Sequence, residues 1–434
     1  MGTFFLENFG CRTTQAEGAA IASELLRRGY QLAARDRAAW VILNTCTVTS
    51  AADEDIRQAV HRIRRENPTA RIVLAGCYAQ RAPSEAATIP GVACVVGNSH
   101  KDRIAELIAD LESEEFSHCR IFVGEVEQAR HFVAADTEFA AGDRTRPVLK
   151  IQDGCSFHCS FCIIPTVRGR SRSAPPEWVV EQVRRLSMRY REVVLSGINL
   201  GRWGRDLPGR MRLADLLRRL LEETDVERLR LSSVEPMDLS DELLRLVAGS
   251  GRIARHIHAP LQSGADSVLR RMRRWYRVRH YEDRILRAHA WIPDAAIGAD
   301  VMVGFPGETE EEFAQTVRLV ERLPFTYLHV FAFSPRPGTP AAQWPDQVPV
   351  KVRKERSRIL RELAARKNLE FRQRMVGHRL SVLTLEDRSL ALSSNYLKVE
   401  LAQPREPNRI VEVEIGDITE TGLRERRTTP STGA

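Results

Sequence analysis

Three closely spaced cysteines are the residues in this chain best suited to redox chemistry. Cys155, Cys159 and Cys162 form a C-x3-C-x2-C triplet directly after an apolar β-type run at residues 148–152. Thiolates at this spacing can bind three irons of a four-iron cluster and leave the fourth open to a non-protein ligand. Zinc is the competing metal, but a structural zinc site needs four protein ligands, and the one nearby candidate, His158, is adjacent to Cys159. The triplet therefore predicts an iron–sulfur cluster with one open iron.

Three further cysteines are distant in sequence but share a structural position. Cys11, Cys46 and Cys77 each follow an apolar β-type run, at spacings of 35 and 31 residues, which is about one strand–helix unit. The carboxyl ends of parallel strands meet at one edge of an open α/β sheet, where ligands bind. The placement therefore predicts a second site with three thiols. Cys94 lies inside an apolar run and Cys119 precedes one, and we expect both to be inert, buried thiols.

The elements that must position these thiols follow from hydrophobic periodicity, which divides the chain into three parts. In the first part, β-type runs alternate with helical runs, which is typical of βαβ units and a parallel sheet. The β-type runs cover residues 3–9, 40–43, 71–75, 91–97 and 121–126, and the helical runs cover 15–28 and 51–65. We expect an α/β domain with a flavodoxin-like parallel sheet at residues 1–130, followed by a polar linker at 131–146.

The second part, residues 147–374, alternates in the same way. Its β-type runs are 148–152, 192–196, 228–232, 256–260, 298–304 and 327–333, and its helical runs are 176–190, 213–223, 240–248, 267–289, 310–321 and 350–373. Six strand–helix units predict a partial (β/α)6 barrel rather than a full eight-unit barrel. In the third part, residues 375–434, the runs 380–385, 397–401 and 409–415 alternate without helical periodicity. They predict a small all-β barrel, with a frayed tail at 424–434.

Polar and glycine residues follow the later strands of the central part. Such residues at the carboxyl ends of barrel strands indicate a binding site rather than scaffold. They are Ser196, Gly197, Asn199, Glu235, Gln262, Ser263 and Gly304.

The cysteine triplet at the end of the first barrel strand closely resembles that of the radical S-adenosylmethionine (SAM) enzymes. The resemblance implies that SAM chelates the open iron, and that one electron from the cluster cleaves it to methionine and a 5′-deoxyadenosyl radical. Phe161 matches the aromatic position that packs near the SAM adenine in that family. The resemblance thus implies a SAM site made by Phe161 and the strand-end residues above.

Two three-cysteine sites, one on each α/β part, resemble the methylthiotransferases over nearly the whole chain. The matching segments are residues 44–49, 76–80, 150–155, 163–165, 168–173, 260–264 and 334–340. The third part looks like the RNA-binding TRAM domain of that family. The resemblance implies two 4Fe–4S clusters, a radical cluster on Cys155, Cys159 and Cys162 and an auxiliary, sulfur-carrying cluster on the other triad, with two SAM molecules consumed per turnover. The radical would activate an inert substrate carbon, and no general acid or base is identified.

Three substrate branches of the family remain as alternatives: threonylcarbamoyl-adenosine in tRNA, isopentenyl-adenosine in tRNA, and an aspartate of a ribosomal protein. Residues 47–49, 270–276 and 331–339 look most like the threonylcarbamoyl-adenosine branch. That branch implies C2 of the adenosine 3′ to the anticodon as the target, the anticodon stem-loop as the partner, and a flavodoxin or ferredoxin as the reductant. One departure concerns residues 10–15, which read Gly-Cys-Arg-Thr-Thr-Gln where the family usually reads Gly-Cys-Lys-Val-Asn-Gln.

Composition is compatible with this assignment. Lys and Arg exceed Asp and Glu by 65 − 57 = 8, and all but six of the cations are Arg, which suits RNA or reflects a coding bias toward Arg. The basic run at 270–274 is either a solvated helix face or a phosphate-binding surface. No apolar run is long enough to span a membrane, no signal peptide is visible, and eight cysteines are too few for a disulfide scaffold. We expect a cytoplasmic protein. Two alternatives come from other functional classes: an iron–sulfur electron carrier, and a zinc-stabilised RNA-binding module without catalytic activity.

Overall fold

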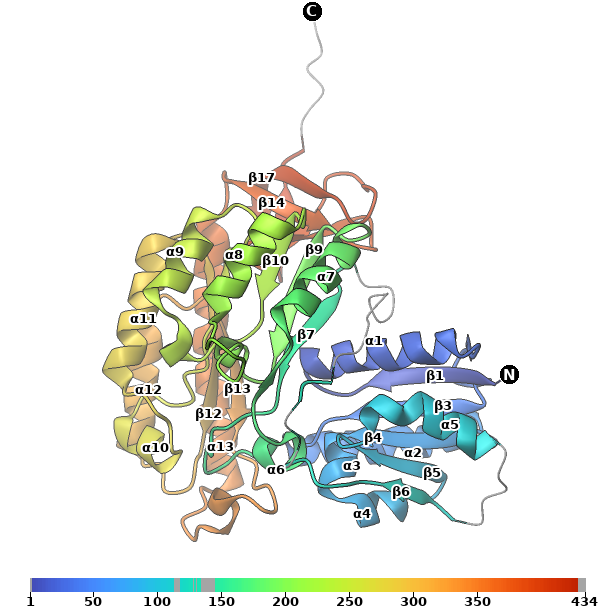
Figure 1. Cartoon of the computed structure of the whole chain (residues 1–434). Coiled ribbons are helices and arrows are strands. Elements are labelled where there is room, and N and C mark those ends of the chain that lie inside the picture. The colour runs from blue at the N-terminus through green and yellow to red at the C-terminus, as the bar shows by residue number, and fades with distance from the viewer. Residues whose placement is uncertain (1, 113–117, 128, 130, 134–144, 428–434) are drawn as a thin grey trace, which may run out of the picture.

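The computed structural model describes residues 2–112, 118–127, 129, 131–133 and 145–427. Figure 1 shows three units: an N-terminal α/β domain, a central barrel wrapped by helices, and a small β-barrel at the end of the central barrel farthest from α6. The predicted fold class is confirmed: the first two units are α/β and the third is an all-β barrel. No helix among the described residues is both long and apolar enough to cross a membrane.

The N-terminal domain is a six-stranded, wholly parallel sheet in the order β2-β1-β3-β4-β5-β6. Its strands are β1 (Thr3–Asn8), β2 (Gln31–Leu32), β3 (Trp40–Thr45), β4 (Arg71–Gly76), β5 (Val92–Gly97) and β6 (Arg120–Phe122). Its helices are α1 (Arg12–Arg27), α2 (Ser50–Glu66), α3 (Cys77–Arg81), α4 (Pro83–Ala87) and α5 (Ile104–Glu112). This strand order is the flavodoxin-like one, in which the direction of winding reverses between β1 and β3.

The central barrel has six parallel strands, as predicted. They are β7 (Val148–Asp153), β9 (Glu192–Gly197), β10 (Arg228–Leu231), β11 (His256–His258), β12 (Ala296–Val303) and β13 (Tyr327–Ala332), and β8 (Arg172–Ser173) pairs antiparallel to β7. The helices are α6 (Ile164–Arg168), α7 (Pro176–Ser187), α8 (Leu213–Glu223), α9 (Asp241–Gly249), α10 (Asp266–Arg271), α11 (Val278–Trp291), α12 (Glu310–Arg322) and α13 (Val350–Arg374). The largest hydrophobic cluster lies between these strands and their covering helices.

The C-terminal unit is a closed five-stranded barrel, which fits a TRAM domain. Its strands are β14 (Arg379–Thr384), β15 (Leu390–Ser393), β16 (Lys398–Glu400), β17 (Ile410–Ile418) and β18 (Leu423–Glu425). Its core is continuous with Phe371 and Met375 at the end of α13 and with Ala296 at the start of β12. The small barrel is therefore anchored to the central one.

Three local expectations differ from the structure. The helix expected at 267–289 is divided into α10 and α11, because the chain turns at Arg273, which has a left-handed φ of 58°. Strands β15 and β18 were not expected, since each is too short to show a period. Residues 424 and 425, expected in the frayed tail, pair in β18, while 428–434 lie outside the described residues. Most of the expected linker, 134–144, also lies outside them, so the domain boundaries remain predictions.

Helix α1 lies on the inner side of the central barrel, against β7 and β9 (Figure 1). On β7, Lys150 and Gln152 point to this inner side, opposite to Leu149 and Ile151, which belong to the hydrophobic cluster. The N-terminal domain thereby covers the open side of the partial barrel, and this places its strand ends close to the cysteine loop that follows β7.

Candidate active site between two cysteine triads

The three N-terminal cysteines meet at the carboxyl edge of their sheet. Cys11 directly precedes α1, Cys46 follows β3, and Cys77 begins α3 immediately after β4. Gly10 has a φ of 131°, and a Cβ there would lie 2.7 Å from Cys46 Cβ and 3.3 Å from its Sγ. Only glycine lets the two loops approach this closely. The geometry places Cys11 and Cys46 at the point where the winding of the sheet reverses, which is the usual ligand position in this fold.

The barrel triplet lies in the loop between β7 and α6. Gly154, with a φ of 68°, precedes Cys155, and a Cβ there would lie 2.0 Å from the carbonyl oxygen of Arg170. The backbone amide of Phe157 donates to Cys155 Sγ at 3.5 Å, and the amide of Cys162 donates to the carbonyl of Cys159 at 3.1 Å. The loop therefore curls around its own sulfur atoms, as a cluster-binding loop must.

The electrostatics of both triads fit a thiolate-bound metal cluster. Burial raises the pKa of Cys46 to about 12, and the neighbouring Cys77 adds to the rise. Burial likewise raises the pKa of Cys162 to about 12, with Cys159 contributing. Buried thiols in mutual proximity cannot all ionise without a cation, and metal ions supply that charge. Each triad therefore fits a metal cluster whose positive charge would stabilise the deprotonated thiolates.

A single zinc ion needs metal-binding side chains grouped closely around it. Zn–S bonds of about 2.3 Å place tetrahedral sulfur ligands roughly 3.8 Å apart. Across the described residues, the one group of three metal-binding side chains whose ligand atoms all lie within 4.8 Å of one another is His258, Asp300 and His329. Neither cysteine triad is among the groups at this spacing in the described part of the chain.

The His258, Asp300 and His329 group is explained by hydrogen bonds. Asp300 Oδ1 lies 3.1 Å from His258 Nε2 and 3.2 Å from His329 Nδ1. Burial acts to raise the pKa of Asp300, but the hydrogen bonds from both histidines outweigh it and hold the pKa below its usual value. Tyr327 Oη continues the network, at 2.9 Å from His258 Nδ1 and 2.7 Å from His256 Nε2.

A small cavity lies between the two cysteine loops. Its volume is about 220 Å³, and Val48 and Thr49, just after Cys46, face Cys162 and its neighbours across it. Two predicted SAM-binding residues, Phe161 and Gln262, line this cavity. The remaining lining residues are Ile163, Ile164, Asp300, Met302, Phe331, Ala332, Phe333 and Ser334. The space is thus bounded by both protein domains and by both predicted metal loops.

The other predicted SAM-binding residues occupy different surroundings. Asn199 Nδ2 lies 3.8 Å from Cys155 Sγ, which places Asn199 beside the barrel triplet. Glu235 is ion-paired with Arg274, and Gly197 abuts Gln152, where a Cβ would lie 2.8 Å from the Gln152 side chain. The last three predicted residues contact neighbouring parts of the protein or are buried. Ser196 is buried, and Ser263 is buried and contacts Thr316 on α12. The backbone amide of Gly304 donates to the Glu308 carboxylate at 2.6 Å.

Two residues that sequence reasoning did not assign contact the predicted metal ligands. Arg274 donates to Cys159 Sγ at 3.4 Å, and Asn98 Nδ2 donates to Cys77 Sγ at 3.4 Å. Asn98 follows the end of β5, so the strand-end rule used for the cysteines would have identified it. Arg274 is part of the basic run at 270–274, for which the sequence leaves open a solvated helix face or a phosphate-binding surface.

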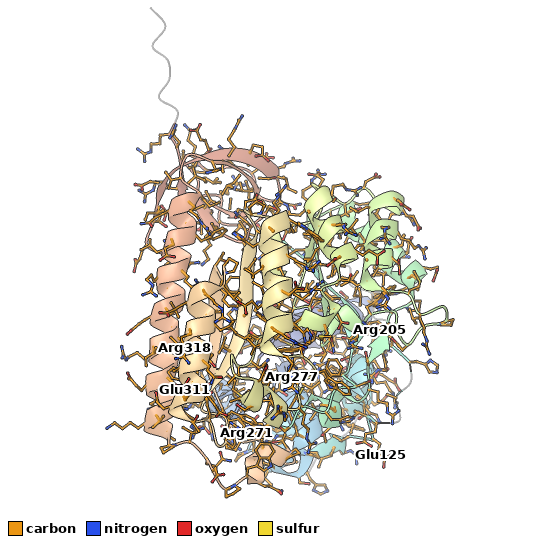
Figure 2. All side chains as sticks on the ribbon, turned by 90° about the vertical axis from the view of Figure 1, so that its left-hand side faces the viewer. Glu125, Arg205, Arg271, Arg277, Glu311 and Arg318 are labelled. Atoms are coloured by element: carbon orange, nitrogen blue, oxygen red, sulfur yellow. The ribbon has the colours of Figure 1, made fainter. Side chains whose placement is uncertain are left out.

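That basic run does not form one uniform surface. Arg274 is 5% exposed and pairs with Glu235, while Arg271 pairs with Glu312 at 2.7 Å. Arg270 and Arg273 are exposed. Figure 2 shows Arg271 below α11 and α12, on the side of the barrel that the helices cover. Only half of the run is therefore available to bind phosphates.

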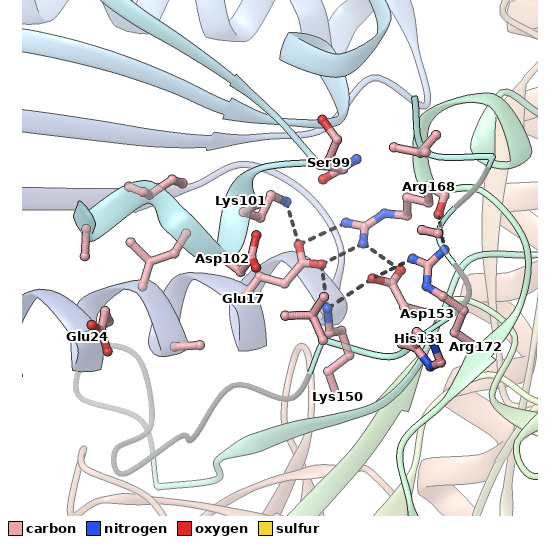
Figure 3. A pocket seen from close by; sticks show the side chains of 18 of the residues that line it. Glu17, Glu24, Ser99, Lys101, Asp102, His131, Lys150, Asp153, Arg168 and Arg172 are labelled. Atoms are coloured by element: carbon pink, nitrogen blue, oxygen red, sulfur yellow. Dashed lines mark hydrogen bonds and ion pairs between the residues drawn. The ribbon is translucent and has the colours of Figure 1, made fainter. Parts of the chain in front are cut away.

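A buried ion network connects the N-terminal domain to the barrel (Figure 3). Arg168 NH1 and NH2 donate to the two carboxylate oxygens of Glu17 at 2.7 and 3.0 Å, and Lys101 and Lys150 also pair with Glu17 at 2.7 and 3.1 Å. Arg168 also contacts Asp153, two residues before Cys155, at 3.0 Å. Although burial acts to raise the pKa of Glu17, these cations hold it well below its usual value. The network borders a cavity of about 670 Å³ between the two domains.

Comparison with known proteins identifies the family. The Radical SAM superfamily model matches residues 149–320, and "Uncharacterized protein family UPF0004" matches residues 3–118. The chain is 37% identical to the "Threonylcarbamoyladenosine tRNA methylthiotransferase MtaB" of Aquifex aeolicus over 94% of this chain and 98% of that protein. It is 38% identical to the Bacillus subtilis protein of the same name, over 92% of this chain and 90% of that one.

The chain belongs to the radical SAM methylthiotransferase family. The sequence-based assignment is thus confirmed, as are the fold class and the enzymatic activity of radical SAM methylthiotransferase. Two 4Fe–4S clusters and SAM are the cofactors, and each of the two cysteine triads described above offers three free thiols as donors.

Solved structures of radical SAM enzymes share the fold at low sequence identity. The methyltransferase TsrM from Kitasatospora setae, determined with cobalamin and a [4Fe-4S] cluster bound, aligns with a TM-score of 0.55 at 16% identity over 79% of this chain and 77% of that chain. The cobalamin-dependent enzyme OxsB aligns with a TM-score of 0.51 at 11% identity over 84% of this chain and 56% of that chain. These similarities support the arrangement of an α/β domain beside a partial barrel.

Proposed function

We propose that this enzyme methylthiolates C2 of N6-threonylcarbamoyladenosine in tRNA, at the adenosine 3′ to the anticodon. The observation that carries the proposal is the near full-length similarity to relatives named for that substrate, at 35–38% identity in four bacteria. A relative named "tRNA-2-methylthio-N(6)-dimethylallyladenosine synthase", from Syntrophotalea carbinolica, is 34% identical over 88% of each chain. The isopentenyl-type nucleoside is therefore the second candidate substrate.

The arrangement of the two triads supports this chemistry. When bound, the cofactors would supply a 5′-deoxyadenosyl radical from the barrel triplet and a methylthio group from the N-terminal triad. A C–H bond on an aromatic carbon is too inert for acid–base catalysis, so the protein's task is to position the carbon between the two. We propose that Cys155, Cys159 and Cys162 bind the radical cluster and that Cys11, Cys46 and Cys77 bind the auxiliary cluster. Residues from both domains then enclose the reacting atoms and exclude water.

We further propose that the SAM site comprises Phe161, Ser196, Gly197, Asn199, Glu235, Gln262, Ser263 and Gly304. Phe161 and Gln262 line the cavity, and Asn199 and Glu235 lie around the barrel triplet. The family also requires one-electron reduction, for which we propose a flavodoxin or ferredoxin, and we propose that the enzyme acts in the cytoplasm. Isothermal titration of the reconstituted Asn199→Ala variant with SAM tests this assignment, and SAM affinity equal to that of the wild type would refute it.

Nucleoside mass spectrometry of tRNA tests the substrate. Total tRNA from cells with and without the gene is digested, and the methylthio nucleosides are quantified. Loss of 2-methylthio-N6-threonylcarbamoyladenosine with accumulation of its unmethylthiolated form supports the proposal. Loss of the isopentenyl-type methylthio nucleoside instead would assign the enzyme to the second branch, and loss of neither, with a mass change on a ribosomal protein, to the third.

A further inference from the structure

The interior of the central barrel contains an excess of buried positive charge. Arg228 and Arg230 of β10 point to the inner face, opposite to Leu229 and Leu231, which belong to the hydrophobic cluster under the helices. Arg230 is 0% and Arg228 is 2% exposed. Guanidinium groups in such surroundings need anionic partners, because burial of an unpaired charge costs several kcal/mol.

Glu192 of β9 is the shared partner of these arginines. Arg230 Nε lies 2.7 Å from its carboxylate, and Arg228 NH1 and Arg146 NH1 each lie 3.4 Å from it. Arg12 of α1 belongs to the same group. Its charge helps to lower the pKa of both Arg146 and His256, and Arg12 and Arg230 both lie over the ring of Tyr396. Within the part of the chain that the structure describes, Glu192 is the one carboxylate in ion-pair distance of any of these four guanidinium groups. The group therefore carries three more positive than negative charges.

The neighbouring titratable groups do not restore the balance. His256 is neutral, because burial and the charges of Arg230 and Arg12 hold its pKa well below the usual value. The next carboxylate along the barrel, Asp300, is engaged by His258 and His329. Glu412 acts on Arg228 from beyond ion-pair distance. Arg12 has no carboxylate partner among the described residues, so its charge is left for a ligand.

Arg12 is the member of the group whose hydrogen-bonding capacity is left open. Its NH2 donates to Tyr396 Oη at 2.8 Å, while its NH1 is buried and has no hydrogen-bond partner among the described residues. By contrast, Arg230 also donates to the carbonyls of Ser393 and Ser394, at 3.1 and 3.0 Å. The hydrogen bond from NH2 orients the guanidinium, and NH1 still has its N–H groups to donate, so Arg12 is suited to bind a carboxylate.

A partly exposed row of aromatic rings leads from the cavity beside Cys162 toward Arg12. Alternate residues of β13 share a face, and Phe331, which lines the cavity, lies 6.4 Å from His329 between ring centroids. His329 lies 5.4 Å from Tyr327, and Tyr327 lies 5.9 Å from Tyr396, over which Arg12 is placed at 5.6 Å. Phe331 is 45% exposed and the His329 side chain 54%. A ligand in the cavity can therefore extend along this row to the arginine.

We propose that Arg12 binds the carboxylate of the threonylcarbamoyl group, and that this contact distinguishes the substrate from nucleosides with a neutral N6 substituent. The inference rests on the proposed function. Threonine joined through its amino group to the carbamoyl carbon keeps a free carboxylate, whereas an isopentenyl group carries no charge. Because Arg12 directly follows Cys11, the same contact would hold the base beside the auxiliary triad. Tyr396 of the C-terminal barrel acts as a positioning residue for Arg12.

Binding of matched RNAs to the anaerobically reconstituted full chain tests the proposal. The probes are anticodon stem-loops that differ only in the adenosine 3′ to the anticodon, which is N6-threonylcarbamoylated, isopentenylated or unmodified. We expect wild type to bind the first about tenfold more tightly than the others, as one charge-assisted hydrogen-bonded pair implies. Arg12→Met should abolish the preference without changing affinity for the unmodified stem-loop, Arg12→Lys should retain part of it, and Tyr396→Phe should reduce it.

The control variant is Arg318→Met, which removes an exposed arginine on α12, on the helix-covered side of the molecule (Figure 2). It should keep the full preference. The iron content of Arg12→Met should equal that of wild type, which excludes damage to the cluster at Cys11. If Arg12→Met weakens binding of all three RNAs equally, Arg12 contacts a backbone phosphate and the proposal is wrong. If wild type methylthiolates the threonylcarbamoylated RNA and Arg12→Met keeps the preference, only this inference fails. If wild type shows neither preference nor activity on that RNA, the proposed function itself fails.

Discussion

Arg168 of the barrel and Glu17 of α1 form a bidentate, buried ion pair across the domain boundary, with N–O distances of 2.7 and 3.0 Å. Arg168 also contacts Asp153, which lies two residues before Cys155. Arg168 also interacts electrostatically with Cys46 and Cys77 of the N-terminal triad. One arginine thus connects the loops that carry the two triads, and this gives the pair a role in fixing the distance between them.

Replacement of Glu17 by Gln should destabilise the protein strongly. It leaves Arg168, Lys101 and Lys150 buried around a neutral amide, and breaking a buried pair of this kind costs about 3–5 kcal/mol. Urea unfolding monitored by circular dichroism measures the loss. Glu355→Gln, which removes an exposed partner of Arg358, serves as the control and should leave the midpoint unchanged. Equal midpoints for Glu17→Gln and wild type would contradict a structural role for the network.

Stability should fall in acid, partly through Glu192. Burial acts to raise the pKa of Glu192, but Arg230, Arg146 and Arg228 lower it to about 2 from an ordinary value of 4.5. A carboxyl group with a lowered folded-state pKa stabilises the protein above its unfolded-state pKa, and this contribution is lost as the pH falls toward the folded-state value. Thermal unfolding temperatures should therefore decline between pH 4.5 and about 2. Glu192→Gln should have a lower unfolding temperature at pH 7 and a shallower decline, and a parallel decline would refute the assignment.

The two triads should be separable by mutation. Cys155→Ala should abolish SAM cleavage, whereas Cys46→Ala should abolish methylthiolation and leave measurable SAM cleavage. Each variant should bind about four irons per chain instead of about eight. Liquid chromatography of 5′-deoxyadenosine and of the nucleoside products gives both activities, and Cys94→Ala, a buried thiol outside the triads, is the control. Loss of both activities in equal measure in Cys46→Ala would argue against two roles.

Arg274 should tune the radical cluster. It donates to Cys159 Sγ at 3.4 Å and is nearly fully buried, and a cationic hydrogen-bond donor at a cluster sulfur raises the reduction potential. Arg274→Gln should therefore lower the potential of that cluster and leave the auxiliary cluster unchanged, as measured by potentiometric titration with electron paramagnetic resonance. A potential shift in both clusters, or in neither, would contradict a local effect.

The exposed half of the basic run should contact RNA. Arg270 and Arg273 are exposed, and Trp275 is 72% exposed and stacks on Phe157 of the cysteine loop at 6.1 Å. Replacing both arginines with Gln should weaken tRNA binding and make the slope of log affinity against log salt shallower by about 1 to 2. Nitrocellulose filter binding over a salt series measures the slope. Arg318→Met should keep the wild-type slope, and an unchanged slope in the double variant would show that this surface does not face the RNA.

Much of the fold and both triads could be predicted from local patterns. Cys11, Cys46 and Cys77 were found because strand periodicity places each at a strand end, and parallel strand ends converge in space. Periodicity failed where elements were short, as in β15 and β18, and where a helix broke at Arg273. The apolar periodicity of residues 267–289 continues across Arg273, because both α10 and α11 bury one face. The periodicity therefore does not reveal that the chain turns there.

The contacts of single side chains were less accessible. Arg274 belongs to a run of arginines that is typical of a solvent-exposed helix face. Nothing in the sequence of the run distinguishes Arg274, which points inward to Cys159, from its exposed neighbours. Asn98 could have been found by the strand-end rule, whereas Glu17 could not, since a lone acid in a helix has many solvated counterparts.

The sequence by itself determined the chemistry: the thiol donors, their grouping into two triads, the sheet and barrel that carry them, and the family. Only the tertiary structure decided what lies between the triads. The cavity lined by Thr49 and Phe161, the Glu17–Arg168 pair and the approach of Arg12 to Tyr396 all join residues more than 100 positions apart. Such contacts depend on how whole domains pack against one another, and packing orientation leaves no period in the sequence. Local periodicity records which face of an element is buried, but not which distant element covers it.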